Sequence, residues 1–396
     1  METNSNIVPI LIGNKEEEEE NSVVEMVVGK SSYSAQMKRK REILTNRKSL
    51  PDEMVFEIIA RLPAEDIYNY AVLVCRKWYR AIHTRNFVYS HLRQSTPGLL
   101  VQTLCCGNSA SFFVSMSRGR VVVSEFGYEL RGGTWASCNG LIVEFDYWKD
   151  ALHITNPAIK QHSTIPLFSF PVASHDCHCI AYSAASMEYK VVVAYRIKDG
   201  NSRVLRLAIR TVGVDESWRH VCTEHLPNDI EANTPFITEG FIHWPSRKTH
   251  VLTLNVETEV ITETPVPQGY EKRYKYYLST GKSLSFIINC SEFSLEVWEM
   301  KSETREWTKM CNVDLEARKS KFEHLYCRND SSPFMLVPGG WLNYQEVLVL
   351  CVSHKTRVCI AYNLRTQEIG FFELGYDCKY PNFEVHTNSL VWFSGS

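Results

Sequence analysis

The segment richest in potential metal ligands is His175-Asp176-Cys177-His178-Cys179. On a strand, His175, Cys177 and Cys179 would lie on one face, because successive side chains alternate between faces. Zinc sites more often pair ligands two to four residues apart, and no second pair with matching spacing is evident in the sequence. We therefore predict that this segment is an ordinary strand or loop, and that the protein binds no metal or other cofactor.

A second candidate is Thr280-Gly281-Lys282-Ser283, which ends like a phosphate-binding loop. That motif needs an earlier glycine where this sequence has Tyr276, and a helix where Leu284 to Ile288 predicts a strand. Gly339-Gly340 predicts a turn. No serine, cysteine or carboxylate stands in a recognisable catalytic motif, so the sequence predicts no catalytic residues. A triad assembled only in space escapes such a search.

Composition indicates a globular protein with room for a large core. The 396 residues suggest two or three domains at about 150 residues each. The net charge of -2 gives no global attraction to nucleic acid or membrane, and no run of about 18 apolar residues predicts a membrane span. The 13 cysteines are odd in number and irregularly spaced, and the N-terminus lacks the pattern of a signal peptide. We therefore expect a reducing compartment, the nucleus and/or the cytoplasm.

Residues 1–48 have the composition of a disordered tail. Glu16 to Glu20 forms an acidic block and Lys38-Arg39-Lys40-Arg41 a basic one, and such blocks usually stay solvated. The basic block could be read by nuclear import factors, or it could be no more than a solvated linker.

Residues 49–95 show a helical pattern. Ser49 can cap a first helix, in which Val55, Ile58, Ile59 and Leu62 share one apolar face. Pro63 interrupts this helix, and a second begins with acidic residues that the helix dipole favours. The apolar face of this second helix repeats the same spacing with Ile67, Tyr70, Ala71 and Val74, and a third helical piece follows through Trp78, Ala81 and Ile82. Three short helices form a small core that a partner surface could complete.

Residues 98–396 change to short runs with the period of strands. Examples are Arg120 to Val123, Tyr189 to Tyr195, Ser283 to Ile288 and Glu346 to Val352. Turn residues separate these runs, and no long helical pattern occurs among them. The expected fold class is therefore α+β multidomain: a small helical domain followed by an all-β sandwich, barrel or propeller.

A weak internal repeat favours a propeller. Apolar segments lead into polar turns and then into another strand at Leu152 to Gln161, Leu252 to Thr264, Leu295 to Lys309 and Val358 to Phe372. The turns of the middle two lie about 45 residues apart, which is a period typical of propeller blades. The other spacings are uneven, so the number of blades stays open.

Two stretches resemble one family. Leu50-Pro51-Asp52-Glu53, Ile58, Leu62-Pro63 and Val74-Cys75-Arg76-Lys77-Trp78 resemble the F-box, with its Leu-Pro start and Val-Cys-(basic)-x-Trp segment. Ser137-Cys138-Asn139-Gly140-Leu141, Asn156-Pro157 and Glu239-Gly240-Phe241-Ile242-His243-Trp244 resemble the F-box-associated, kelch- or propeller-like repeats of plant F-box proteins. Ala64-Glu65-Asp66 and Tyr68-Asn69-Tyr70 depart from the usual F-box pattern, which bears on the strength of docking.

The resemblance implies a role in ubiquitin transfer. An F-box binds a Skp-type adaptor and through it a cullin scaffold, while the β-domain holds a protein target, so the chain would supply proximity and no chemistry. By resemblance, the residues expected to bind the adaptor are Leu50, Pro51, Ile58, Leu62, Pro63, Val74, Cys75 and Trp78. Trp78 is the expected anchor, because large aromatic side chains often dominate interfaces.

Two other classes of function remain as alternatives. One is a β-propeller enzyme or carbohydrate-binding domain with a helical N-terminal support, and the other is a nuclear scaffold without a ubiquitin role. The exposed Leu-Pro and Val-Cys-x-x-Trp arrangement discriminates among them, because an enzyme has no need of it. The sequence does not identify the target, since specificity resides in the loops of the β-domain.

Overall fold

The computed structural model describes residues 50–105, 108–130, 134–146, 149–167, 174–199, 202–223, 226, 234–245, 249–270, 273–325, 334–352, 355–375 and 381–393. The predicted tail at residues 1–48, with its basic block, lies outside them. The chain divides into two units, Met1–Val55 and Phe56–Ser396, and most of the fold belongs to the second. The domain limits expected from sequence, 49–95 and 98–396, remain predictions.

Short helices occupy the N-terminal part of the described chain. They are α2 (Asp52–Ile59), α3 (Ala64–Asp66), the π-helix η1 (Ile67–Ala71), α4 (Val72–Val74), α5 (Arg76–Ile82) and α6 (Arg85–Gln94). The predicted break at Pro63 is confirmed, and the next helix begins with Glu65 and Asp66 in its first turn. Within the described residues, none of the helices has the length and apolar character to cross a membrane.

Six antiparallel four-stranded sheets follow, and we number them as blades. The first two are blade 1 (β24 Asn382–His386, β1 Gly98–Cys105, β2 Asn108–Ser117, β3 Arg120–Glu125) and blade 2 (β4 Thr134–Cys138, β5 Leu141–Asp146, β6 Ala151–Asn156, β7 Gln161–Pro166). The next two are blade 3 (β8 Ser174–Ser183, β9 Glu188–Asp199, β10 Ser202–Thr211, β11 Arg219–Val221) and blade 4 (β12 Phe236–Thr238, β13 Phe241–Pro245, β14 His250–Asn255, β15 Val260–Pro265). The last two are blade 5 (β16 Lys275–Ser279, β17 Leu284–Ser291, β18 Ser294–Met300, β19 Trp307–Asp314) and blade 6 (β20 Leu336–Leu342, β21 Val347–Val352, β22 Lys355–Asn363, β23 Ile369–Glu373). Two 3-10 helices, η2 (Pro157–Ile159) and η3 (Glu316–Leu325), lie between strands.

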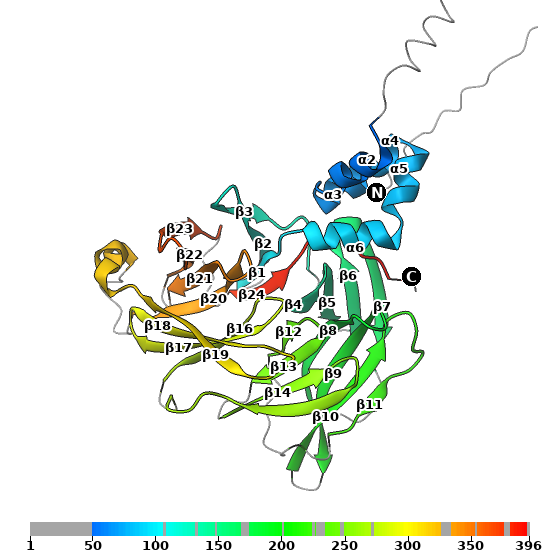
Figure 1. Ribbon diagram of the computed structural model, residues 1–396. Coiled ribbons are helices and arrows are strands. Elements are labelled where there is room, and N and C mark those ends of the chain that lie inside the picture. Colours follow the sequence, from blue (N-terminus) through cyan, green and yellow to red (C-terminus); the bar gives the residue numbers. More distant parts are fainter. Residues whose placement is uncertain are drawn as a thin grey trace, which may run out of the picture. The chain divides into compact units, whose positions relative to one another are not determined.

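The sheets form a closed six-blade propeller. The first strands of the blades, β24, β4, β8, β12, β16 and β20, contact one another in a ring. Strand β24 comes from the C-terminal end of the propeller sequence, yet it pairs with β1 in the register Gly98↔His386. Figure 1 shows this pairing as a red arrow beside a cyan one. Blade 1 therefore joins the two ends of the propeller sequence.

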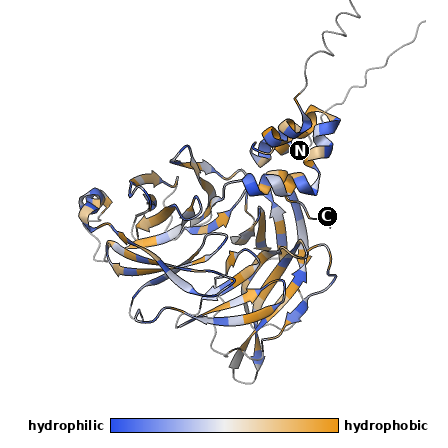
Figure 2. Cartoon of the chain, in the orientation of Figure 1, coloured by the Kyte–Doolittle hydropathy of each residue, from blue (hydrophilic) through white to orange (hydrophobic). Residues whose placement is uncertain are grey.

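The hydrophobic core lies between neighbouring blades. One cluster joins blades 3 and 4 around Trp244, another joins blades 5 and 6 around Trp341, and a third joins blades 6 and 1 around Leu99. Middle strands such as β6 and β21 are buried along their whole length, whereas the outer strand β7 alternates. Figure 2 shows the resulting hydrophobic stretches along the strands. A strand covered on both faces needs a continuous apolar run, and an outer strand needs every second residue.

The strands and repeats expected from sequence are confirmed. The four predicted runs fall in β3, β9, β17 and β21. All four repeat segments run from the third strand of a blade through the turn and into the fourth strand, in blades 2, 4, 5 and 6. The spacing is uneven because blade 3 lies between the first and second of these segments, and because η3 lies between the third and fourth.

The prediction of a turn at Gly339-Gly340 is wrong. Both glycines lie in β20, where the register shifts between Pro338 and Gly340. A Cβ atom at Gly340 would lie 2.6 Å from Leu99, and one at Gly339 would lie 3.0 Å from the ring of Phe383. These glycines therefore allow blade 6 to approach blade 1 closely.

Candidate functional site

Large apolar side chains lie exposed on the short helices. The most exposed are Leu73 at 77%, Tyr70 at 69% and Val74 at 59% of their accessible surface. Of the residues expected to bind the adaptor, seven are exposed, namely Leu50, Pro51, Ile58, Leu62, Pro63, Val74 and Cys75, and Trp78 is half-buried. Exposed apolar residues gathered in this way commonly mark a protein interaction surface.

The helices bury a different set of apolar residues. Ile67 and Phe87 are fully buried, and the ring of Phe56 packs edge-on against Phe87 with centroids 4.9 Å apart. His91 adds a polar link, because its Nε2 lies 3.0 Å from the carbonyl oxygen of Leu62. The core of the helices is therefore complete without Leu73 or Val74, which remain available to a partner.

Sequence reasoning missed several parts of the helical segment. It did not predict helix α6, although Thr84 caps it by accepting a hydrogen bond from the amide of Phe87 at 3.2 Å. It also placed Tyr70 and Val74 on the same face as Ile67 and Ala71, whereas the structure buries only the latter two. The apolar run from Ala71 to Val74 was the available signal, because one helix face cannot hold four consecutive residues.

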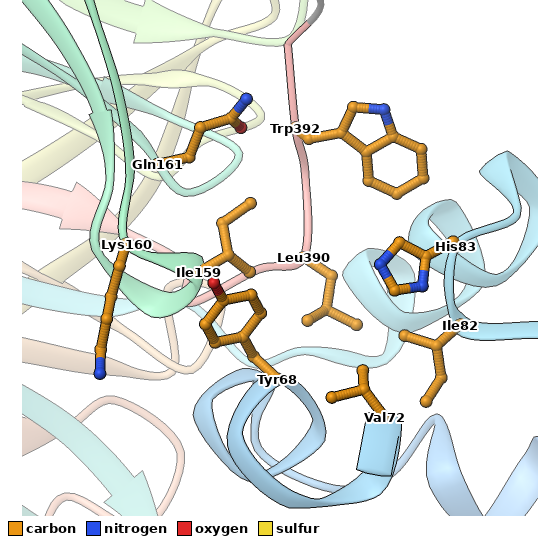
Figure 3. Close-up of a pocket in the computed structure, with 9 residues that line it drawn as sticks. All are labelled: Tyr68, Val72, Ile82, His83, Ile159, Lys160, Gln161, Leu390 and Trp392. Carbon is orange, nitrogen blue, oxygen red and sulfur yellow. The ribbon is translucent and has the colours of Figure 1, made fainter. Parts of the chain in front are cut away.

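A cavity of about 320 Å³ lies between the helices and the C-terminal segment, residues 387–393 (Figure 3). Tyr68 and Val72 line it from η1 and α4, Ile159 lines it from η2, and Leu390 and Trp392 line it from the C-terminal segment. The imidazole ring of His83 also lines it, with its centroid 6.3 Å from that of Trp392. The C-terminal segment thus contacts this part of the helices as well as blade 2.

A larger groove of about 650 Å³ lies over the ends of the first strands of all six blades. Turns after β4, β8, β12 and β16 line it, and Tyr89 and Arg93 of α6 form one wall. The hydroxyl of Tyr182 donates to that of Tyr89 at 3.0 Å, which fixes α6 to blade 3 at this wall. The groove has about twice the volume of the cavity beside the helices, and its size suits a ligand or a protein segment.

Charged and aromatic side chains meet in this groove. Glu239, Glu257 and Glu303 contribute carboxylates, and Lys282 lies over the ring of Tyr344 at 5.1 Å. Burial and then the negative charge of Glu239 raise the pKa of the Tyr344 hydroxyl. The groove therefore combines negative charge with aromatic surface.

At the bottom of the groove, a hydrogen bond joins β4 to β24. The hydroxyl of Ser137 lies 2.8 Å from Nδ1 of His386, whose Nε2 lies 3.0 Å from Oδ1 of Asn388. Nε2 therefore donates to the amide oxygen, and Nδ1 accepts from the serine. Burial lowers the pKa of His386 to about 4, which makes this imidazole a weak general base. The arrangement suits closure of the ring better than activation of a nucleophile.

Beside it, the motif residues Asn139, Gly140 and Asn156 hold the C-terminal segment. Asn156 is fully buried, and its Nδ2 donates to the carbonyl oxygens of Ser389 at 3.1 Å and Val391 at 2.6 Å. The hydroxyl of Ser389 donates to the carbonyl oxygen of Asn139 at 2.6 Å. Gly140 has a φ of +88°, and a Cβ atom there would lie 2.3 Å from Oγ of Ser389. We call the residues Ser137, Asn139, Gly140 and Asn156 the closure clasp.

The two candidate chemical motifs have local structural roles. Cys177 and Cys179 are buried in the core between blades 3 and 4, where Nε1 of Trp244 donates to Sγ of Cys177 at 3.2 Å. The side chains of His175 and Asp176 lie outside the described set. Among the described residues, no group of three His, Cys, Asp or Glu side chains is placed to hold a metal ion. Thr280 to Ser283 forms a turn in which Oγ1 of Thr280 accepts from the amide of Ser283 at 3.0 Å.

Comparisons with known proteins agree with this division into helices and propeller. Residues 48–95 match the family model described as F-box-like, and residues 89–392 match that of the F-box associated beta propeller domain. The second match covers most of the chain.

Individual relatives are more distant. An F-box protein of Arabidopsis thaliana is 25% identical over 260 residues, covering 63% of this chain and 69% of its own length. Another F-box protein of that plant is 21% identical over 351 residues, covering 77% and 76%. Among solved structures, a protein from Lactobacillus plantarum matches with a TM-score of 0.37 and 9% identity, over 72% of this chain and 99% of its own. A score this low supports no conclusion about function.

Proposed function

The chain belongs to the family with an F-box associated β-propeller domain, and from this premise we propose that it is the substrate-receptor subunit of an SCF-type ubiquitin ligase. In this role the helices bind a Skp-type adaptor, which is attached to a cullin scaffold. The propeller binds a protein target, and the chain itself has no catalytic role. A separate enzyme transfers ubiquitin to the target, which the receptor holds at high effective concentration.

The exposed apolar residues of the helices carry the proposal. Leu73, Tyr70 and Val74 expose more than half of their surface to water, although the helices already bury a core of their own. Apolar surface that a partner covers contributes about 25 cal/mol of binding free energy per Å² removed from water. A partner that covers these side chains would therefore gain free energy, which is what adaptor binding requires.

Calorimetric titration of the full chain with a purified Skp-type adaptor tests this role. Trp78→Ala should weaken binding by about 2 kcal/mol or more if the half-buried ring is an anchor. Val74→Ala should weaken binding by about 1.5 kcal/mol, because it removes two methyl groups worth roughly 0.8 kcal/mol each.

Val214 provides a matched control for this titration. It lies on the propeller with 61% of its surface exposed, close to the 59% of Val74, so Val214→Ala should leave adaptor affinity unchanged. A wild-type chain that does not bind the adaptor would rule out the proposed role, and equal effects of the two valine substitutions would rule out this surface.

We also propose that the protein acts in the nucleus and/or the cytoplasm, as its odd number of cysteines and the basic run 38–41 suggest. Fluorescence microscopy of the tagged chain tests this, with the run changed to alanines as the comparison. Equal nuclear signal from both chains would show that the run is not an import signal.

A further inference from the structure

We propose that the groove of about 650 Å³ binds an extended segment of the target protein through a lysine or arginine side chain of that segment. This inference rests on the proposed role of the propeller as the target-binding part. It goes further by assigning the place of binding and the charge of the bound residue.

The first argument is the unbalanced negative charge of the groove. Glu239 follows β12, Glu257 follows β14 and Glu303 follows β18, so three separate turns bring carboxylates to one groove. All three are exposed, and within the described residues none of them takes part in an ion pair. Glu259, by contrast, is paired with Arg219 at 2.7 Å.

Two cations line the groove, against three carboxylates, and both have other contacts. Lys282 lies over the ring of Tyr344, and Nε of Arg93 donates to the backbone oxygen of Tyr89 at 3.4 Å. Neither forms an ion pair with a groove carboxylate in the described part of the chain. An arriving cationic side chain therefore meets carboxylates that have no competing partner.

The second argument is the aromatic surface beside the carboxylates. Phe241 is half-buried and Tyr344 is exposed, and both line the groove. A guanidinium or ammonium group packs favourably on the face of an aromatic ring, as Lys282 already does on Tyr344. Rings and carboxylates together suit a cationic side chain, whose apolar stem packs on a ring while its head meets the charge.

The shape of the groove favours a protein segment. Residues of all six blades and of α6 line it, and its volume of about 650 Å³ exceeds what one side chain can fill. Its wall also offers hydrogen-bonding groups, including the hydroxyls of Tyr89 and Tyr182. A segment with polar backbone groups and one central cationic residue uses both the length and the charge.

Phage display of random peptides on the purified full-length protein tests the proposal. Peptides that also bind the variant Glu239→Gln/Glu257→Gln/Glu303→Gln are removed first, so that those retained depend on the groove. Representative peptides are then synthesised and titrated by fluorescence polarisation. A control variant, Glu292→Gln/Glu306→Gln/Glu323→Gln, changes the net charge equally at exposed sites that do not line the groove.

The expected result is a set of peptides enriched in lysine or arginine. They should bind the wild type and the control variant equally, and bind the groove variant about tenfold or more weakly. Phe241→Ala should also weaken them. Retained peptides that are acidic or uncharged would overturn the proposal, as would the absence of any peptide that depends on the groove. Adaptor binding, titrated on the same preparations, reports separately on the proposed function.

Discussion

Replacement of Asn156 by alanine should loosen the C-terminal segment of the propeller. The side chain is fully buried and makes three hydrogen bonds, to the oxygens of Ser389 and Val391 and from the amide of Ala158 at 3.1 Å. A buried hydrogen bond contributes about 1 kcal/mol net, so losing three should lower the free energy of unfolding by about 3 kcal/mol. The loss should be greatest where the segment joins β24, because the freed carbonyl groups can regain water only if it opens.

Urea unfolding measures the overall loss, and hydrogen exchange followed by mass spectrometry locates it. Exchange should accelerate in β24 and in residues 387–393 while the middle strands of blades 3 to 5 stay protected. Asn312, exposed on β19, supplies the control, and Asn312→Ala should change stability by less than about 0.5 kcal/mol. If Asn156→Ala lowered the free energy of unfolding by less than about 1 kcal/mol, or accelerated exchange uniformly, the role of the closure clasp in holding the C-terminal segment would be refuted.

Two predictions concern pH. Burial raises the pKa of Glu384 to about 8, so ionisation of this carboxyl group destabilises the folded state. Glu384→Gln should therefore have a higher melting temperature than the wild type, and the difference should grow as the pH rises from about 5 to about 8. A difference in melting temperature that stays constant over this range would contradict it. The hydrogen bond from Arg219, followed by that from Lys190, lowers the pKa of Glu259 despite the opposing effect of burial. Glu259→Gln should therefore have a lower melting temperature than the wild type at neutral pH, and the difference should vanish as the pH falls through the folded-state pKa of Glu259. A difference in melting temperature that persists in acid would show that the charge of Glu259 is not its cause.

The local pattern of the sequence determined much of the fold. Strands such as β21 combine consecutive β-branched and apolar residues with turns on either side, and this pattern requires no knowledge of distant residues. The repeat of strand, turn and strand likewise reports one unit of a propeller. The blade number was hidden because blade 3 has longer strands, β8 to β10, than its neighbours and did not show the same segment.

The candidate sites depended more on contacts between distant residues. The adaptor-binding residues could be assigned by resemblance, and the structure shows most of them exposed, but whether they bind remains a prediction. The groove could not be predicted, since Glu239, Glu257 and Glu303 belong to turns whose neighbours in space are set by the ring. The pairing of Ser137 with His386 was equally hidden, because no local signal connects residues so far apart in the chain.

The pairing of β24 with β1 also has a consequence for the newly made chain. During synthesis from the N-terminus, β1 emerges early, yet its innermost partner is made only after the other five blades. Until then one edge of β1 has unpaired backbone groups, which can pair with strands of other chains. A product that stops before Asn382 would retain the helices, and with them the proposed adaptor-binding surface, while carrying an open propeller.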